Sequence, residues 1–451
     1  MDIAGKFVVV VGLGKSGAAA ASACARLGAR VLGTDQRPRS ELSPEVLGLG
    51  IEIVAGGHQG VPFSSADYVV VSPGVPAFAG LDAAARAGAE VIGELELAFR
   101  LLIRQGAERR IVAVGGTNGK STTTLLVHEL LGGNERRVFV GANFGTPACE
   151  AVFDEHSAHV LEVSSFQLER APRFRPNVSV LLNITDDHLD RYASFDDYAR
   201  AKGNAFVNQT EADFAVVPSG DAACLAQARR GRGRIVTFGP GGDYFAADGK
   251  LVEAASGAHV MLGDAKLYGT HNLSNAAAAF AAVRALGTPL EVVTAGLRRF
   301  QPLGHRMALA GAVRGVRFYD DSKATNVGAA VTALLGLTEA RAVLIAGGRD
   351  KLGSYAPLVQ ALGQKGRAVV VIGEAADRIA DAVGSSLPLV RAVSMEEAVA
   401  RAFQVAEPGD AVLLSPACSS FDMFESYADR GERFVRAVSA LSEARGARSG
   451  S

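Results

Sequence analysis

Residues 115–122 of the chain read Gly-Gly-Thr-Asn-Gly-Lys-Ser-Thr, a glycine-rich turn that ends in a lysine and two hydroxyl side chains. The turn follows an apolar run, residues 111–114, and precedes a helix-like run, residues 123–131. In this setting the turn amides and the helix N-terminus point hydrogen-bond donors at an anion, Lys120 adds a positive charge, and the Ser121 hydroxyl can bind Mg²⁺. The pattern predicts a nucleoside triphosphate site formed by Gly116, Thr117, Asn118, Gly119, Lys120, Ser121 and Thr122.

This turn differs from the standard P-loop. That pattern has a glycine five residues before Gly119, where this chain has Val114. The loop is therefore a shorter Gly-Thr-Asn-Gly-Lys form. The alternative is a plain turn that happens to contain these residues, but the strand before it and the helix after it favour a phosphate site.

A second glycine-rich turn lies near the start of the chain. Residues 12–17, Gly-Leu-Gly-Lys-Ser-Gly, follow the apolar run Phe7–Val11, and Asp35 comes directly after another apolar run, residues 29–34. In a Gly-x-Gly-x-x-Gly pattern the glycines let the backbone approach a diphosphate, and the acid binds a ribose hydroxyl. A turn of this shape that binds no ligand is the alternative.

Two candidate metal ligands stand where predicted strands end. Glu162 lies at the end of one strand, residues 159–163, and His188 follows another, residues 178–184. The carboxyl ends of parallel strands meet at one edge of a sheet, so both side chains are expected near the phosphate loop as Mg²⁺ ligands. For His188 the alternative is a surface histidine beside acids.

Two asparagines precede a long predicted helix, residues 276–286. Asn272 and Asn275 are three positions apart, which places them on one face of a helix. They either cap that helix or reach a nucleotide.

The strand and helix patterns divide the chain into three units. At 451 residues it is too long for one ordinary core. We expect boundaries that give domains 1–97, 98–302 and 303–451. Strands alternate with helices in all three, which predicts an α/β fold with parallel sheets.

The composition excludes several classes of protein. Lys and Arg (46) nearly balance Asp and Glu (47), which argues against nucleic acid or an anionic membrane as a main partner. The four cysteines are far apart in sequence and form no metal-ligand pair, so small buried residues in a reducing compartment are expected. We expect a cytoplasmic protein, because no apolar segment is long enough to span a bilayer and the glycines of residues 12–17 interrupt the N-terminal apolar run.

In this order, the motifs resemble the bacterial Mur ligase family, whose members build the peptide of peptidoglycan, and the resemblance covers nearly the whole chain. Two segments, residues 321–326 (Asp-Ser-Lys-Ala-Thr-Asn) and 415–422 (Ser-Pro-Ala-Cys-Ser-Ser-Phe-Asp), are similar to the branch that adds D-glutamate to UDP-N-acetylmuramoyl-L-alanine. The resemblance implies a Rossmann-like domain for the UDP-sugar, a central P-loop-type ATPase and a C-terminal Rossmann-like domain for the amino acid. It further implies ATP, two Mg²⁺ ions, an acyl-phosphate intermediate and small-molecule substrates, and we expect a monomer.

The resemblance also implies roles for individual residues. The residues matched to the UDP-sugar site are Lys15, Ser16, Asp35, Arg37, Gly74 and Asn143. Those matched to ATP, besides the phosphate loop, are Asn272, Asn275, Arg306 and Asp321. Those matched to D-glutamate are Thr325, Lys351, Ser420, Phe421 and Tyr427, with Lys323 near the reaction centre. The matched Mg²⁺ ligands are Ser121, Glu162, His188 and Lys202, and Lys120, His188 and Lys202 are the implied catalytic residues.

Lys202 matches a lysine that is carbamylated in the family, which would convert its cation into a metal-binding anion. Gly203 follows it where the family has a more helix-favouring residue, and a glycine weakens a helix by up to about 1 kcal/mol. Tyr427 stands where phenylalanine is common. Three other functions stay open from the sequence: an NAD-dependent oxidoreductase, a nucleotide-binding regulator without catalysis, and a sister ligase that adds another amino acid.

Overall fold

The structure is a computed structural model that describes residues 1–104, 110–185, 191–263, 265, 267–350 and 353–446. Its strands form three sheets. The chain folds into two compact units: one contains the first and second sheets, and the other contains the third sheet together with the residues that begin α9 (Thr270–Ala285). Among the described helices, none combines the length and the apolar character that crossing a membrane requires.

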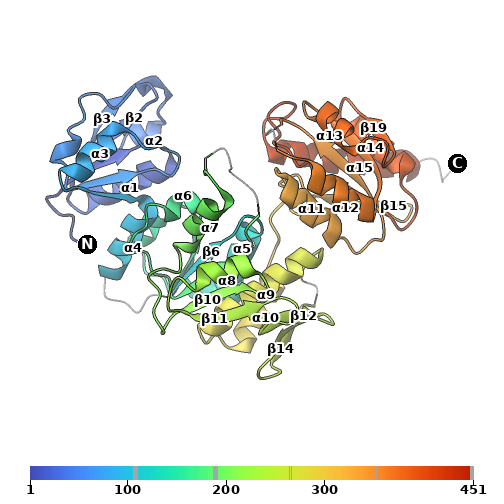
Figure 1. Ribbon diagram of the computed structural model, residues 1–451, viewed down its shortest axis with the longest axis horizontal. Helices are drawn as coiled ribbons and strands as arrows, with labels where there is room; N and C mark the ends of the chain where they lie inside the picture. The colour runs from blue at the N-terminus through green and yellow to red at the C-terminus, as the bar shows by residue number, and fades with distance from the viewer. Residues whose placement is uncertain (105–109, 186–190, 264, 266, 351–352, 447–451) are drawn as a thin grey trace. The chain divides into compact units, whose positions relative to one another are not determined.

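The first sheet is parallel throughout (Figure 1). Its strands, in spatial order, are β3 (Glu52–Ala55), β2 (Arg30–Asp35), β1 (Phe7–Val11), β4 (Tyr68–Val71) and β5 (Glu90–Gly93). Its helices are α1 (Lys15–Arg26), η1 (Arg39–Glu41), α2 (Pro44–Leu47), η2 (Phe63–Ser65), α3 (Ala79–Arg86) and α4 (Glu94–Arg104).

The second sheet has a parallel part and an antiparallel part. Its strands, in spatial order, are β14 (His259–Met261), β13 (Lys250–Glu253), β12 (Tyr244–Ala247), β11 (Arg234–Phe238), β10 (Phe214–Pro218), β9 (Val178–Leu181), β6 (Ile111–Gly115), β8 (Ala158–Glu162) and β7 (Val138–Ala142). Only β12, β13 and β14 pair antiparallel. The helices around this sheet, besides α9, are α5 (Lys120–Leu130), η3 (Gly133–Arg136), η4 (Ala148–Val152), α6 (Ser165–Leu168), α7 (Phe195–Gly203), α8 (Ala222–Ala228) and α10 (Leu290–Arg299).

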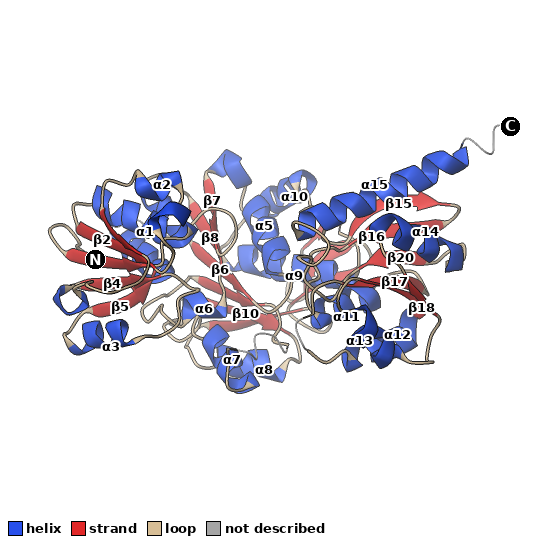
Figure 2. Cartoon of the chain, turned by 90° about the horizontal axis from the view of Figure 1, so that it is seen from above, coloured by secondary structure: helices blue, strands red, loops and turns tan. Residues whose placement is uncertain are grey.

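The third sheet is parallel except at one edge. Its strands, in spatial order, are β15 (Ala308–Val313), β16 (Val316–Asp320), β20 (Ala411–Leu414), β17 (Ala342–Gly347), β18 (Gly366–Ile372) and β19 (Leu389–Arg391), and β15 runs antiparallel to β16. Helices cover both of its faces (Figure 2). They are α11 (Val327–Gly336), α12 (Ala356–Lys365), α13 (Ala376–Val383), α14 (Met395–Val405) and α15 (Tyr427–Gly446).

The side chains of β17 show why this sheet needs two helical layers. Leu344 and Ala346 pack into the core under α11, α12 and α13, whereas Val343 and Ile345 pack into the core under α14 and α15. Successive side chains of a strand point to opposite faces, so an unbroken apolar run is stable only when both faces are covered. The apolar runs in the sequence therefore predict the parallel α/β class, which is confirmed.

Two features of the second sheet differ from expectation. The predicted strand 178–184 ends at Leu181, because its partner β6 ends at Gly115 and the next residues bond the phosphate loop instead: the Thr117 amide donates to the Asn183 oxygen at 3.0 Å. The antiparallel strands β12, β13 and β14 were not expected. Their residues are mostly half-buried or exposed, so they lack the long apolar runs that identify the parallel strands.

Candidate functional site

The phosphate loop lies between β6 and α5, and its backbone depends on glycine. Gly116 and Gly119 have φ angles of 143° and 85°, a region that side-chain-bearing residues rarely adopt. A Cβ atom on Gly119 would lie 2.5 Å from Oδ1 of Asn275, so Asn275 packs directly on the loop. The structure thus brings together the loop and one of the two predicted asparagines.

Asn183 holds the loop from the end of the neighbouring strand, a role that the sequence pattern did not predict. Its Oδ1 accepts from the Asn118 amide at 2.9 Å, and its Nδ2 donates to the Asn118 oxygen at 3.1 Å. Its own backbone oxygen accepts from the Thr117 amide at 3.0 Å. The sequence feature that could have identified Asn183 is its position, because it is a polar residue two positions after the buried strand β9, which lies beside the loop. Asn183 therefore fixes which amides of the loop stay available for phosphate.

Lys120 and Lys202 meet at the base of the loop. The Lys120 ammonium donates to the oxygens of Gly116 and Thr117 at 2.9 and 2.8 Å. The Lys202 ammonium also donates to the Gly116 oxygen, at 2.8 Å, and lies 4.4 Å from the centroid of the Tyr198 ring. Lys202 is only 4% exposed, although it lies in the last turn of α7. The predicted phosphate lysine and the predicted metal-site lysine thus occupy one site.

The helix that carries Lys202 ends one residue later, at Gly203. A Cβ atom there would lie 2.3 Å from Oε1 of Gln227, so the glycine permits the close packing of α8 on α7. Close packing of the two helices therefore accounts for Gly203, where this chain departs from the family pattern. The glycine does not move Lys202 away from the Gly116 oxygen.

Glu162 offers a carboxylate to the same region. It ends β8, pairs in register with Val114 of β6, and is 3% exposed. Its Oε1 accepts from Nδ2 of Asn143 at 2.7 Å, whereas Oε2 is buried without a hydrogen-bond partner among the described residues. A buried, unpartnered carboxylate oxygen is costly unless a cation binds it. The residues present therefore fit a Mg²⁺ ion, with the buried Ser121 hydroxyl in the first turn of α5 as the expected second ligand.

All the predicted UDP-sugar residues except Asn143 lie at the carboxyl ends of β1, β2 and β4. Gly17 must be glycine, because a Cβ atom would lie 1.8 Å from the Gly12 oxygen. The side chain of Asp35 accepts from the Leu13 amide at 2.7 Å and from the Arg37 guanidinium at 2.8 and 3.0 Å. These contacts with Arg37 lower the pKa of Asp35 to about 2. Asp35 therefore holds the glycine turn and Arg37 in place. Of the other predicted residues in this group, Ser16 is half-buried and Gly74 is exposed.

A turn of the second sheet joins this group. The Lys15 ammonium donates to the Gly145 oxygen at 2.6 Å. Gly145 lies two residues after Asn143, whose amide also bonds the Glu162 backbone oxygen at 3.0 Å. The turn that contains Asn143 thus connects the predicted sugar site with the predicted metal site.

In the unit of the third sheet, Arg306 and Asp321 are neighbours. Arg306 stands between His305 and Met307, whose φ angles are 62° and 49°. Asp321 accepts from the Met307 amide at 3.2 Å and from the Ser415 hydroxyl at 2.9 Å. Burial raises the pKa of Asp321 to about 7, against the effect of Ser415 and the charge of Arg306. Asn272 in the first turn of α9 donates to the Tyr268 oxygen at 2.8 Å.

Lys323, Thr325, Ser420 and Phe421 come from two loops that touch, and Tyr427 begins α15. The Ala417 amide donates to the Ala324 oxygen at 3.0 Å, which joins the loop of Lys323 and Thr325 to the loop of Ser420 and Phe421. The Lys323 ammonium lies 3.9 Å from the centroid of the Tyr427 ring. Ser420 is buried, Thr325 half-buried, and Phe421 and Tyr427 exposed, so the last two offer aromatic surface to a ligand.

Arg430 joins these two loops by hydrogen bonds, a second role that the sequence pattern did not predict. It is fully buried in α15, where its guanidinium donates to the hydroxyl and backbone oxygens of Ser322 at 2.9 and 2.8 Å and to the Cys418 oxygen at 3.1 Å. Burial lowers its pKa to about 10, which still leaves it charged at neutral pH. An arginine in an amphipathic helix carries no signal that separates it from a surface residue, so only the fold shows its role.

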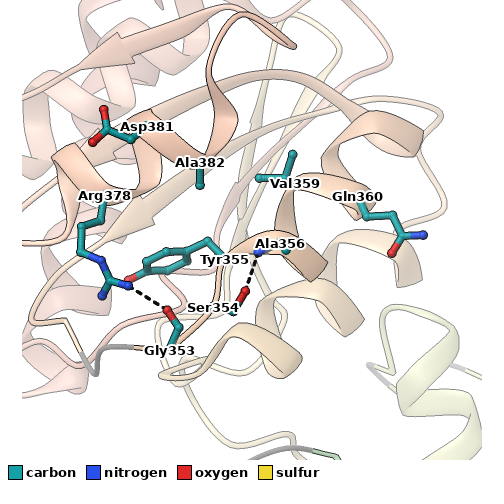
Figure 3. Close-up of a pocket in the computed structure, with 9 residues that line it drawn as sticks. All are labelled: Gly353, Ser354, Tyr355, Ala356, Val359, Gln360, Arg378, Asp381 and Ala382. Carbon is teal, nitrogen blue, oxygen red and sulfur yellow. Dashed lines mark hydrogen bonds between the residues drawn. The ribbon is translucent and has the colours of Figure 1, made fainter.

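Two predicted residues, His188 and Lys351, lie outside the described residues. All four cysteines are buried and free, as expected. A groove of about 650 Å³ lies between α12 and α13, and the side chains of Tyr355, Gln360, Arg378 and Asp381 line it together with smaller residues (Figure 3). The Arg378 guanidinium donates hydrogen bonds to the Gly353 oxygen, at 3.1 Å, and to the Asp350 carboxylate. None of the predicted site residues lines this groove.

Three family models match the chain in succession. Residues 6–93 match the Mur ligase MurD-like N-terminal domain, residues 114–283 the Mur ligase middle domain, and residues 305–418 the Mur ligase glutamate ligase domain. The matches follow the order of the three sheets.

Curated relatives match over nearly the full length. The UDP-N-acetylmuramoylalanine–D-glutamate ligase of Geobacter metallireducens is 44% identical over 98% of this chain and 99% of its own. The enzyme of the same name from Desulfosudis oleivorans is 44% identical over 97% of this chain and 96% of its own.

Solved structures share the fold at lower identity. The pseudomurein peptide ligase type C of Methanothermus fervidus has a TM-score of 0.60 and 18% identity, over 95% of this chain and 99% of its own. The MurF ligase of Thermotoga maritima, solved in complex with ADP, has a TM-score of 0.58 and 21% identity, over 84% of this chain and 96% of its own. At this identity they support the three-domain fold.

Proposed function

The chain belongs to the Mur ligase family, and from that premise we propose how its residues divide the work of an ATP-dependent ligase that joins D-glutamate to UDP-N-acetylmuramoyl-L-alanine in peptidoglycan precursor synthesis. The observation that carries the proposal is the base of the phosphate loop, where Lys120 and Lys202 both donate to the Gly116 oxygen. Glu162 ends the neighbouring strand β8 and has a carboxylate oxygen that no described residue bonds. We assign residues 1–97 to the UDP-sugar, 98–302 to ATP and 303–451 to D-glutamate.

The reaction requires activation of the alanine carboxylate, which is a poor acyl donor at neutral pH. Its oxygen attacks the γ-phosphorus of ATP and releases ADP, which gives an acyl phosphate. The amine of D-glutamate then attacks the acyl carbon, and inorganic phosphate leaves. Phosphoryl transfer depends on placement and on neutralisation of charge rather than on covalent help from the protein.

Lys120 supplies that charge in our proposal. Its ammonium donates to two carbonyl oxygens of the loop, and it would exchange these contacts for those of a bound triphosphate. The phosphate loop, residues 116–122, and the start of α5 would bind the phosphates through amides other than those of Thr117 and Asn118, which donate to Asn183. Asn275 packs on the loop, and Asn272, Arg306 and Asp321 complete the proposed ATP set.

Ser121, Glu162, His188 and Lys202 would hold two Mg²⁺ ions. Bound there, Mg²⁺ neutralises charge that develops on the phosphate oxygens. Lys202 fits this role only as a carbamate, formed when its neutral amine attacks CO₂ and loses a proton. Two ammonium groups on the Gly116 oxygen repel each other, and a carbamate on Lys202 would turn that repulsion into attraction for Lys120.

For D-glutamate we propose Thr325, Lys351, Ser420, Phe421 and Tyr427, with Lys323 near the amine. The joined loops and the charge of Lys323 over Tyr427 support this set. A dicarboxylate needs fixed donors and positive charge, which these residues offer. We also propose a monomer that acts on small molecules in the cytoplasm.

The deciding experiment measures phosphate release with a panel of UDP-sugar acceptors and amino acids. Release that requires both UDP-N-acetylmuramoyl-L-alanine and D-glutamate, one phosphate per amide formed, supports the proposal. A sister ligase would accept a different amino acid, and release without any acceptor would point to a simple nucleotidase.

A further inference from the structure

Glu94, the first residue of α4, is a buried carboxylate with an unusual set of contacts. It is 2% exposed, and its Oε1 accepts from the Cys149 amide at 2.6 Å. Its Oε2 is buried without a hydrogen-bond partner among the described residues. A carboxylate in this position costs free energy of folding, so we looked for a function that would account for its presence.

The contact with Cys149 fixes where η4 begins. This short helix starts at Ala148, and its N-cap residue, Pro147, provides no side-chain hydrogen bond. Glu94 supplies the missing acceptor from a different element. The Cys149 thiol donates to the Glu94 backbone oxygen at 3.7 Å, so the two residues are joined twice.

The turn just before η4 is the one that connects the proposed sugar and metal sites. It is closed at its base by the Ala142 amide, which bonds the Thr146 oxygen at 2.7 Å. The turn positions Gly145 to accept from Lys15, and Asn143 to donate to Glu162. Any shift of η4 therefore moves the proposed ligands of the UDP-sugar.

We propose that Glu94 is a positioning residue whose ionised carboxylate holds the Asn143–Pro147 turn in the conformation that binds the UDP-sugar. This inference rests on the proposed function, and it adds a residue that touches no substrate. The carboxylate also makes the turn sensitive to pH. A protonated Glu94 is a weaker acceptor for the amides of η4, and its added proton has no acceptor beside Oε2.

The groups that face Glu94 explain its titration. Burial raises its pKa to about 7, while the amides of Cys149 and Ala148 favour the ionised form and Glu150 on η4 opposes it. The Cys149 thiol also faces it, with Cys24 of α1 beyond, and burial raises the pKa of both thiols. Glu94 is therefore the group in this cluster that changes charge between pH 6 and 8.

The test is Glu94→Gln, which preserves the size of the side chain and one acceptor oxygen. For the wild type we expect the KM for the UDP-sugar to fall about tenfold from pH 6 to pH 8, as Glu94 ionises. In E94Q that KM should stay high at both pH values, while the KM for ATP and for D-glutamate stay within about twofold of the wild type. Direct calorimetry of UDP-N-acetylmuramoyl-L-alanine binding, without turnover, should show the same loss of pH dependence.

Glu96→Gln is the matched control. Glu96 lies on the same helix, is fully buried, and accepts from the Arg173 amide at 3.1 Å and from Arg100 at 2.6 Å, away from the turn. We expect E96Q to change stability but to preserve the pH dependence of the KM. An E94Q enzyme with the wild-type KM at every pH, or with all three KM values raised equally, would overturn the proposal. If the wild type itself released no phosphate with these substrates, the proposed function would fail instead.

Discussion

The ammonium groups of Lys120 and Lys202 donate to a single acceptor, the backbone oxygen of Gly116, at 2.9 and 2.8 Å. The two lysines are 82 positions apart in the sequence, one at the start of α5 and one near the end of α7. Two positive charges side by side favour the binding of an anion or the conversion of one lysine to an anion. Both possibilities are consistent with phosphate and carbamate chemistry.

Lys120→Ala should abolish most ligase activity without unfolding the chain. Loss of one charged donor at a phosphoryl-transfer transition state lowers kcat by about 10²–10³-fold. Phosphate release and circular-dichroism melting would be measured together. Lys6→Ala is the control, because Lys6 forms an exposed ion pair with Asp67, and such pairs contribute little. Wild-type turnover in K120A would remove Lys120 from the ATP site.

Lys202→Ala should fold and lose turnover, and the wild type should carry a carbamate. Incubation with ¹³C-bicarbonate should give a carbamate carbon signal in the NMR spectrum of the wild type and of K120A. K202A should lack that signal. A wild-type spectrum without it, recorded in the presence of Mg²⁺ and nucleotide, would show that the ammonium seen beside Gly116 is the working form.

The sequence predicted the parts of the site that belong to contiguous motifs. The phosphate loop was recognisable because glycines, a lysine and hydroxyls lie within eight residues between a strand and a helix. Glu162 was predicted as a metal ligand because it ends a buried strand. These features depend on local backbone conformation, which neighbouring residues determine.

The missed residues act over long distances in the sequence. Asn183 is 65 positions from Asn118, and Arg430 is 108 positions from Ser322. Nothing local distinguishes either from an ordinary polar residue, because their roles arise only when strands and helices pack. The antiparallel edge, β12 to β14, was missed because short, half-exposed strands have no strong pattern.

Asn183→Ala should raise the KM for ATP by about 10–100-fold, because two hydrogen bonds to Asn118 are lost, each contributing about 1 kcal/mol or more. Asn177→Ala is a matched control. Its Oδ1 accepts from the Ile111 amide at 3.0 Å, at the opposite end of β6. We expect N177A to lower the melting temperature while its KM for ATP stays unchanged. Equal effects of the two variants would mean that Asn183 serves stability alone.

Arg430→Lys should raise the KM for D-glutamate at least tenfold while changing the KM for ATP much less. Lysine keeps the charge but cannot reach both Ser322 and Cys418 with a planar fork. Arg433→Lys, one turn away and paired with Asp429 on the surface, should have no effect. If R430K raised both KM values alike, Arg430 would be a general stabiliser of its unit.

Asp321→Asn should remove a pH dependence from the stability of the third-sheet unit. The pKa of Asp321 is raised by burial from 3.8 to about 7, so the folded chain binds this proton more tightly than the unfolded chain does. The resulting contribution is complete below pH 3.8 and disappears as the pH rises through 7, a change of up to about 4 kcal/mol. Asparagine does not titrate, so the melting temperature of D321N should rise relative to that of the wild type between pH 5 and pH 8. The same measurement on Glu94→Gln identifies the part of the pH dependence that comes from Glu94, another buried carboxyl whose pKa is also about 7. If the melting temperatures of D321N and the wild type changed in parallel with pH, Asp321 would not change its charge between pH 5 and pH 8. Met307 and Ser415 would then donate hydrogen bonds to a permanently ionised carboxylate.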